Sequence, residues 1–192
     1  MRTIRSHQYA NKMLVNSSLV AACLALFALS ARADVVDSSA DGFTLKTTVQ
    51  IQASPDAVYR RLFQIGDWWS SAHTFSGDSK NLTLEEKVGG CLCEKFANGG
   101  GARHLELISL MPGKTLVLSG GLGPLQAIGA TGALSIQLAA SEGGTRLQVT
   151  YAVTGHLAAG MNTLAAPVDG VLAEQFRRLQ NLIEHGSPAP KQ

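Results

Sequence analysis

Alternation of apolar and polar residues predicts one strand early in the chain and six more after residue 80. Phe43, Leu45, Thr47, Val49 and Ile51 alternate with polar positions, which is the pattern of a half-buried strand. Short glycine-containing turns separate the later strands, so most pairings are expected to be antiparallel. The six later strands are predicted at 82–84, 91–96, 103–110, 115–119, 134–138 and 147–153.

Two short helices are predicted directly after the first strand. The sequence Ser-Pro-Asp at 54–56 supplies an N-cap, a proline for the first turn and an acidic residue that complements the helix dipole. Gly66 is expected to break this first helix. The adjacent pair Trp68 and Trp69 is expected to lie in a second short turn or helix, with one ring in the core and the other available to a ligand.

A long amphipathic helix is predicted from about residue 163 to residue 185. Its apolar residues repeat at helical spacing, and charged residues occupy the opposite face. A helix of this length runs roughly 35 Å, at 1.5 Å per residue, which is enough to cross a whole sheet. The apolar face comprises Val168, Val171, Leu172, Phe176, Leu179, Leu182 and Ile183.

Residues 1–33 resemble a secretory signal peptide. Basic residues precede an apolar run at 19–29, and Ala-Arg-Ala at 31–33 is a small-x-small cleavage pattern, so cleavage is expected after Ala33. The alternative is an uncleaved N-terminal anchor. We therefore expect an exported protein, periplasmic or secreted, in which residues 34–42 form a polar leader and no further segment crosses a membrane.

Charge argues against nucleic acid as a partner. The chain has a formal net charge of +2, but residues 1–33 hold four of its 16 basic residues and none of its 14 acidic ones. The remainder therefore carries a net charge of −2. That remainder lacks the basic excess needed to neutralise a run of phosphates.

The order of elements resembles the helix-grip architecture of the START-like or SRPBCC superfamily. This group includes polyketide cyclase-like proteins and homologues of the heat-shock-protein ATPase activator. The resemblance implies an α+β fold, in which a seven-stranded curved antiparallel sheet wraps around the long C-terminal helix. The domain would span 34–186 and leave 187–192 as a disordered tail. The residues that carry the resemblance are 51–69, 88–96, 111–120, 143–151 and 168–184.

This architecture is expected to leave a ligand cavity. A curved sheet with a helix laid across it leaves a gap that side chains or a ligand must fill, and the resemblance implies a hydrophobic small molecule or lipid. Loops 119–133 and 155–167 are rich in glycine and small apolar residues, and they are either mobile lids or tightly packed turns. The candidate ligand contacts are Trp68, Trp69, Phe75, Leu122, Leu125, Tyr151, Leu164, Val168 and Leu172.

A carboxylate and an imidazole form the strongest candidate for chemistry. If residues 96 and 102 face each other, Glu94 faces His104, and Glu106 joins the same face. Inside the cavity this pair can move a proton, and His73 is a further candidate. A register shift of one would instead place Arg103 opposite Glu94. The alternative to a binding protein is therefore a cofactor-independent cyclase, isomerase or hydrolase of the polyketide-cyclase type.

Cys91 and Cys93 are the only cysteines after residue 33. At positions i and i+2 of a regular strand their Cα atoms would lie about 6.6 to 6.8 Å apart, so a disulfide would require a local kink. We interpret them either as two small buried apolar residues, or as a redox pair or part of a soft-metal site. Their spacing is not a strong zinc signature.

The remaining motifs predict no cofactor and no metal. Gly121 and Gly123 begin like a dinucleotide fingerprint, but Gln126 stands where the last glycine is required.

Overall fold

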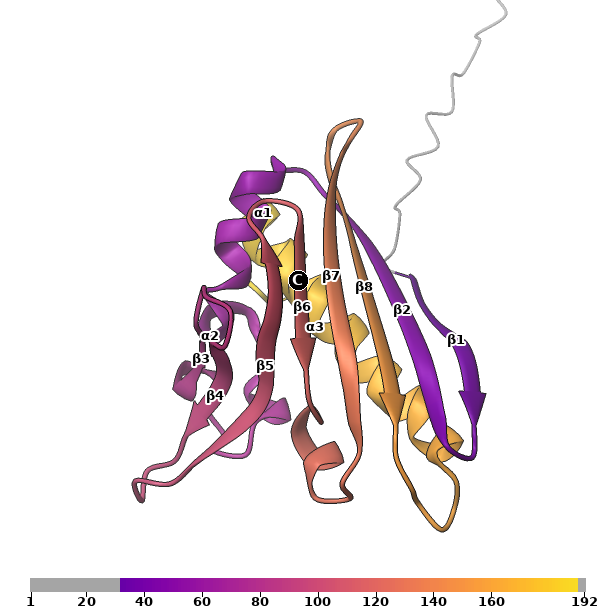
Figure 1. Cartoon of the computed structure of the whole chain (residues 1–192). Helices are drawn as coiled ribbons and strands as arrows, with labels where there is room; N and C mark the ends of the chain where they lie inside the picture. Colours follow the sequence, from indigo (N-terminus) through magenta and orange to yellow (C-terminus); the bar gives the residue numbers. More distant parts are fainter. Residues whose placement is uncertain (1–31, 190–192) are drawn as a thin grey trace, which may run out of the picture.

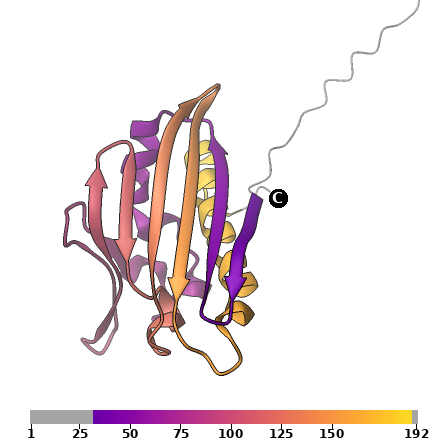
Figure 2. The same ribbon diagram turned by 45° about the vertical axis from the view of Figure 1, so that its right-hand side comes forward.

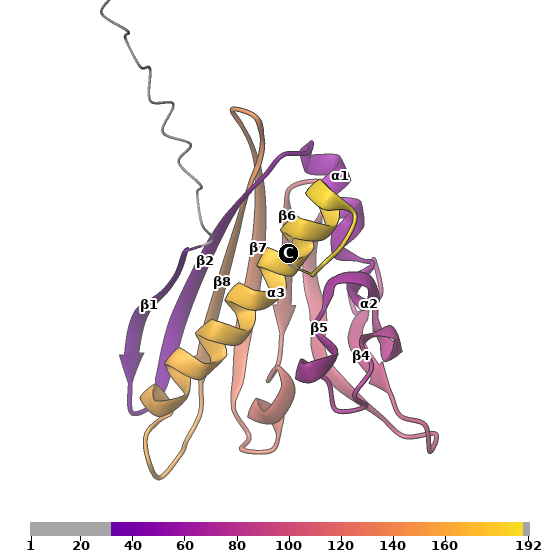
Figure 3. The ribbon, with the colours of Figure 1, turned by 180° about the vertical axis from the view of Figure 1, so that it is seen from behind.

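A single antiparallel sheet of eight strands and one long helix build the molecule, for which we describe residues 32–189 of a computed structural model. The strand order is β1-β2-β8-β7-β6-β5-β4-β3, and α3 crosses one face of the curved sheet diagonally (Figures 1 and 3). The strands are β1 Arg32–Ser39, β2 Gly42–Ile51, β3 Leu82–Leu84, β4 Cys91–Lys95, β5 Gly101–Met111, β6 Thr115–Ser119, β7 Thr131–Ser141 and β8 Gly144–Thr154. The helices are α1 Pro55–Leu62, α2 Ile65–Trp68 and α3 Ala165–His185, with 3-10 turns η1 Ser71–His73, η2 Ser79–Asn81, η3 Gly123–Gln126 and η4 Met161–Leu164.

The expected count of seven strands is wrong because residues 34–42, interpreted as a polar leader, belong to a hairpin. The segment Arg32–Ser39 pairs with β2 at one edge of the sheet, next to the start of the described chain (Figure 2). Side chains 34–39 are exposed, so the strand is held by main-chain hydrogen bonds and has no apolar periodicity to reveal it. The predicted signal peptide lies outside the described residues, apart from the first two residues of β1.

The helix start predicted at residue 54 is confirmed, whereas the helix break predicted at residue 66 is not found there. The Ser54 side chain accepts a hydrogen bond from Ala57 N, and Pro55 opens α1, as predicted. The prediction that Gly66 breaks the helix is wrong, since α1 ends at Leu62 and Gly66 lies inside α2. A Cβ at Gly66 would stand 3.0 Å from Ser79 O, so the missing side chain allows α2 to pack against η2.

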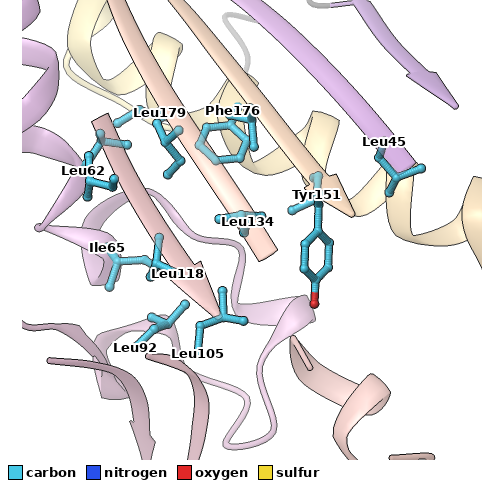
Figure 4. Packing of buried hydrophobic residues seen from close by; sticks show 14 of the residues in the cluster. Leu45, Leu62, Ile65, Leu92, Leu105, Leu118, Leu134, Tyr151, Phe176 and Leu179 are labelled. Atoms are coloured by element: carbon cyan, nitrogen blue, oxygen red, sulfur yellow. The ribbon is translucent and has the colours of Figure 1, made fainter. Parts of the chain in front are cut away.

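Helix α3 begins two residues later than predicted and ends as predicted. Residues 161–164 form the 3-10 turn η4, and Gly186 ends α3 with a left-handed φ of 75°. Its buried face packs on the sheet (Figure 4). Gln175 is also fully buried on that face, where its Oε1 accepts the Ser70 N–H at 2.7 Å. This hydrogen bond attaches the segment after α2 to the helix.

The first prediction concerns the contact between α3 and α2. Phe176 is 2% exposed, and its ring centroid lies 5.7 Å from that of Trp68. Phe176→Ala should lower the free energy of unfolding by about 3–5 kcal/mol, because it leaves a cavity between helix and sheet. Urea unfolding measures the change. The control Arg177→Ala, on the exposed side of α3, should stay within about 0.5 kcal/mol of the wild type; equal losses in the two variants would contradict this packing.

Candidate functional site

A cavity of about 450 Å³ lies between the first half of α3, the η1 segment and the η3 loop. Its size falls within the range of about 300 to 1,000 Å³ that is typical of small-molecule sites. Four of its twenty lining residues, Trp69, His73, Thr74 and His104, have a polar side-chain atom, and none is Lys, Arg, Asp or Glu. The lining residues are Ile65, Trp69, Ala72, His73, Thr74, Phe75, Leu82, Leu92, His104, Leu122, Gly123, Pro124, Leu125, Ile128, Leu157, Leu164, Pro167, Val168, Val171 and Leu172.

Seven of the nine candidate ligand contacts line this cavity, and Trp68 and Tyr151 do not. Trp68 lies in the core, where its Nε1 donates to Arg61 O at 3.1 Å. Its neighbour Trp69 reaches the cavity, and the Trp69 Nε1 donates to His73 O at 2.9 Å. The two ring centroids lie 5.7 Å apart with the ring planes at 59°, and of the two residues Trp69 lines the cavity.

The hydroxyl of Tyr151 fixes the η3 loop rather than facing the cavity. It donates to Gly120 O and accepts the Leu122 N–H, both at 3.0 Å. Burial raises the pKa of Tyr151 to about 12, so the hydroxyl remains a neutral donor and acceptor. Figure 4 shows the Tyr151 side chain extending from its strand toward this loop.

A β-bulge in β5 directs His104 into the protein. Leu92 pairs with Leu105 and Cys93 pairs with Arg103, so His104 is an extra residue without a partner in β4. As a result His104 and Leu105 are both buried, although they are consecutive residues of one strand. The predicted register, with Glu94 directly opposite His104, is wrong, because Glu94 pairs with Ala102.

The Glu94–His104 pair nevertheless forms, with Glu94 Oε2 at 2.9 Å from His104 Nε2. Glu94 also accepts the backbone N–H groups of Phe75 and Ser76. Burial acts to raise the pKa of Glu94, but the hydrogen bonds from Ser76, Phe75 and His104 outweigh it and hold that pKa below the ordinary value of 4.5. A buried, ionised carboxylate therefore fixes the chain at residues 75–76.

The other nitrogen of His104 faces the η3 loop. The Gly123 N–H donates to His104 Nδ1 at 3.3 Å, and Gln126 Nε2 lies 3.3 Å from the same atom. A backbone N–H can only donate, so Nδ1 is an acceptor and the proton of a neutral imidazole lies on Nε2, facing Glu94. Phe75 covers the imidazole with a centroid separation of 5.4 Å.

Glu106 and Arg103 do not join this cluster. Both predicted placements are wrong: Glu106 pairs with Arg103 at 2.7 Å at the surface, and Arg103 lies opposite Cys93 rather than Glu94. His73 lines the cavity. Its Nε2 lies 3.1 Å from Glu174 Oε2, and both side chains reach the protein surface.

Cys91 and Cys93 form a disulfide, so their interpretation as two free buried thiols is wrong. Their Cα atoms lie 5.3 Å apart, which is shorter than two regular strand rises. Both are half-buried and alternate with Leu92 and Glu94, whose side chains point into the core. The shortening of β4 lies beside the bulge in β5, and both changes bend this pair of strands.

Sequence reasoning missed Gln126 and Gln175, the two amide side chains that join separate segments around the site. Nothing in the spacing of either residue distinguishes it from a surface glutamine. Within residues 32–189 no group of three or more His, Cys, Asp or Glu side chains could hold a metal ion. No helix of this same stretch is long and apolar enough to cross a membrane.

Comparisons with known proteins identify the fold. No family model matches the chain, and no curated protein matches its sequence. A conserved protein of unknown function from Enterococcus faecalis has a TM-score of 0.57 at 15% identity, over 86% of this chain and 83% of that one. A Mesorhizobium loti protein gives 0.55 at 18% identity, over 73% and 96% of the two chains.

A solution structure of an Aha1 dimer from Colwellia psychrerythraea gives a TM-score of 0.53 at 22% identity, over 74% of this chain and 97% of that one. At these identities the likeness concerns the fold alone. The class established is an α+β protein with a curved antiparallel sheet and a long C-terminal helix, which is compatible with a helix-grip fold.

The second prediction tests the buried charge. Glu94→Gln should lower the free energy of unfolding at pH 7 by about 1–3 kcal/mol, because its amide NH₂ meets backbone donors that the carboxylate accepts. A lowered folded-state pKa stabilises the protein above pH 4.5, and this contribution is lost as pH falls through the folded value. The difference from the wild type should therefore shrink toward pH 3.

Urea unfolding at several pH values measures this difference. The exposed Glu142→Gln serves as the control, with an expected change within about 0.5 kcal/mol. A Glu94→Gln deficit that grows between pH 4.5 and pH 3 would contradict an ionised Glu94.

Proposed function

We propose that this protein is an exported member of the START-like superfamily that binds one neutral, apolar small molecule or lipid in the cavity between α3 and the sheet. The composition of the cavity wall is the observation that carries the proposal. Sixteen of its twenty residues have no polar side-chain atom, and the other four, Trp69, His73, Thr74 and His104, already direct polar atoms to protein partners. The likeness to the Aha1 dimer supports the superfamily assignment.

The same wall argues for an uncharged ligand. Burying an ionised group without a partner is costly, and no lining side chain is a lysine, arginine, aspartate or glutamate that could compensate it. Burial of apolar surface contributes roughly 25 cal/mol per Å², so a hydrocarbon or aromatic body is sufficient for binding. The aromatic rings of Trp69 and Phe75 offer flat contact surfaces.

Export remains part of this proposal on the strength of the signal-like segment 1–33. The disulfide supports it, because disulfides persist mainly in oxidising compartments.

The third prediction uses two dyes with the same pair of ring systems. Neutral N-phenyl-1-naphthylamine should bind with enhanced fluorescence and, at about 100 times its Kd, raise the Tm by roughly 5–10 °C. The anionic 1-anilinonaphthalene-8-sulfonate should bind at least about tenfold more weakly, because its sulfonate finds no cationic partner in the cavity. Equal binding of both dyes, or binding of neither, would contradict the proposal.

A cavity-filling variant locates the dye. Val168→Trp places an indole in the cavity and should abolish dye binding while the protein remains folded by circular dichroism. Arg177→Trp adds the same group to the exposed side of α3 and should bind the dye as the wild type does. Retained binding in Val168→Trp would place the dye elsewhere.

A cofactor-independent cyclase, isomerase or hydrolase of the polyketide-cyclase type is our second proposal. The ionised Glu94 beside His104, whose ring lines the cavity, is the observation that favours it. The carboxylate would make Nδ1 a stronger base once a substrate displaces the Gly123 N–H.

The fourth prediction separates this second proposal from simple binding. Within a panel of aryl esters and cyclisable polyketones, turnover by an enzyme of this kind should fall at least about 100-fold in His104→Gln, in line with general-base catalysis. The surface variant Glu142→Gln should leave the rate unchanged. Equal rates in His104→Gln and the wild type would exclude His104 as the base.

A further inference from the structure

Two separate loops at the cavity meet at the imidazole of His104. On one side the Gly123 N–H and the Gln126 amide of the η3 loop contact Nδ1, both at 3.3 Å. On the other side Nε2 donates to Glu94, which in turn accepts the N–H groups of residues 75–76. Gly123 and Phe75 both line the cavity, so one ring connects two segments of its wall.

The two sides respond differently to a proton. A protonated imidazole has two N–H donors and no acceptor, so Nδ1–H would face the Gly123 N–H donor to donor. The Glu94 side would gain an ion pair in place of a hydrogen bond. A cation beneath the Phe75 ring is likewise favourable. Protonation therefore releases the η3 loop and keeps residues 75–76 in place.

We propose that His104 is a proton-sensitive clasp, which holds the η3 loop closed over the cavity when neutral and releases it when protonated. Release of the loop opens the cavity and weakens retention of its guest. This second step rests on the binding function proposed above, whereas the release of the loop does not.

Glycines with a left-handed backbone conformation lie at both ends of the η3 loop. Gly123 and Gly129 lie at its two ends with φ of 57° and 68°, and a Cβ at either position would meet nothing within 4 Å. These glycines therefore serve backbone conformation rather than close packing. Apart from His104, the loop is held by the Tyr151 hydroxyl at Leu122 N, by Gln126 Nε2 at Arg103 O and by the buried side chain of Leu125.

Glu94 is the charged group that contacts the imidazole of His104, and it does so at Nε2. An added proton therefore binds at Nδ1, which faces the Gly123 N–H. From β4 the imidazole faces Glu94, and the η3 loop and residues 75–76 contribute only neutral groups. On its own strand the Arg103 guanidinium is paired with Glu106 at the surface. The His73–Glu174 pair belongs to η1 and α3 and also lies at the surface, and Tyr151 contacts the loop as a neutral phenol.

Amide hydrogen exchange of the ligand-free protein tests the release directly. Protection factors, which correct for the intrinsic effect of pH on exchange, are compared between pH 8 and pH 5, the interval in which imidazoles ordinarily change charge. We expect protection of the Gly123, Leu125 and Gln126 amides to fall about two- to tenfold, as for loss of one hydrogen bond, while protection of the Phe75 and Ser76 amides is kept. Unchanged protection of the Gly123, Leu125 and Gln126 amides would overturn the proposal.

Two variants test whether the pH dependence of loop protection comes from the imidazole of His104. His104→Gln cannot take up a proton, so the loop's protection should no longer depend on pH. His73→Gln removes the other histidine of the cavity and should retain the wild-type response. A response that persists in His104→Gln would overturn the clasp. In the wild-type protein, imidazole ¹⁵N shifts report the same event, and a proton on Nδ1 of His104 at pH 8 would also overturn it.

The affinity for N-phenyl-1-naphthylamine separates this proposal from the binding function. Affinity should fall by a similar factor between pH 8 and pH 5 in the wild type and in His73→Gln, and stay constant in His104→Gln. Absence of binding at pH 8 counts against the binding function alone, since loop exchange still decides the clasp. Binding that is equally tight at both pH values would overturn the link between loop and cavity.

Discussion

The hydrogen bond between Glu94 and His104 is the interaction on which the shape of this site depends. It joins adjacent strands deep inside the protein, with Glu94 1% exposed and His104 6% exposed. Each partner then fixes a different loop, one at residues 75–76 and one at Gly123. An isolated carboxylate at this depth would be costly to bury, and its three donors stabilise the ionised form.

The geometry that allows this pair arises in the strands themselves. The disulfide at 91–93 shortens β4, while the extra residue at 104 lengthens β5 by one position. A shorter strand beside a longer one bends the sheet and increases its twist. Helix α3 crosses one face of the curved sheet (Figure 3). Side chains from α3 and from strands β3, β4 and β5 line the cavity.

The spacing of apolar residues was sufficient to predict most of the helices and strands, but it did not predict the contacts within the candidate site. Helix α3 and the strands β2 to β8 follow from apolar residues at regular spacing, because burial on one face imposes that spacing. In strand β1 the side chains of residues 34–39 are exposed, and the strand pairs with β2 through its backbone, so it left no such pattern. The helix start at 54–56 was readable because capping is a local interaction.

The pairing of Glu94 with His104 was predicted from a register that the structure does not have. Residues 103–110 read as a plain alternating strand, and nothing in them marks 104 as an inserted position. Likewise Tyr151 shared a face with core residues, but only the folded loop shows that its hydroxyl binds backbone groups. Bulges and loop contacts depend on tertiary structure, and spacing along the chain does not encode them.

A crystal structure under xenon pressure tests whether an open apolar space lies between α3 and the sheet. Xenon enters apolar cavities without needing a hydrogen bond. We expect xenon density within the space bounded by Trp69, Leu125 and Leu172. An empty difference map, with these three side chains collapsed into mutual contact, would contradict this expectation.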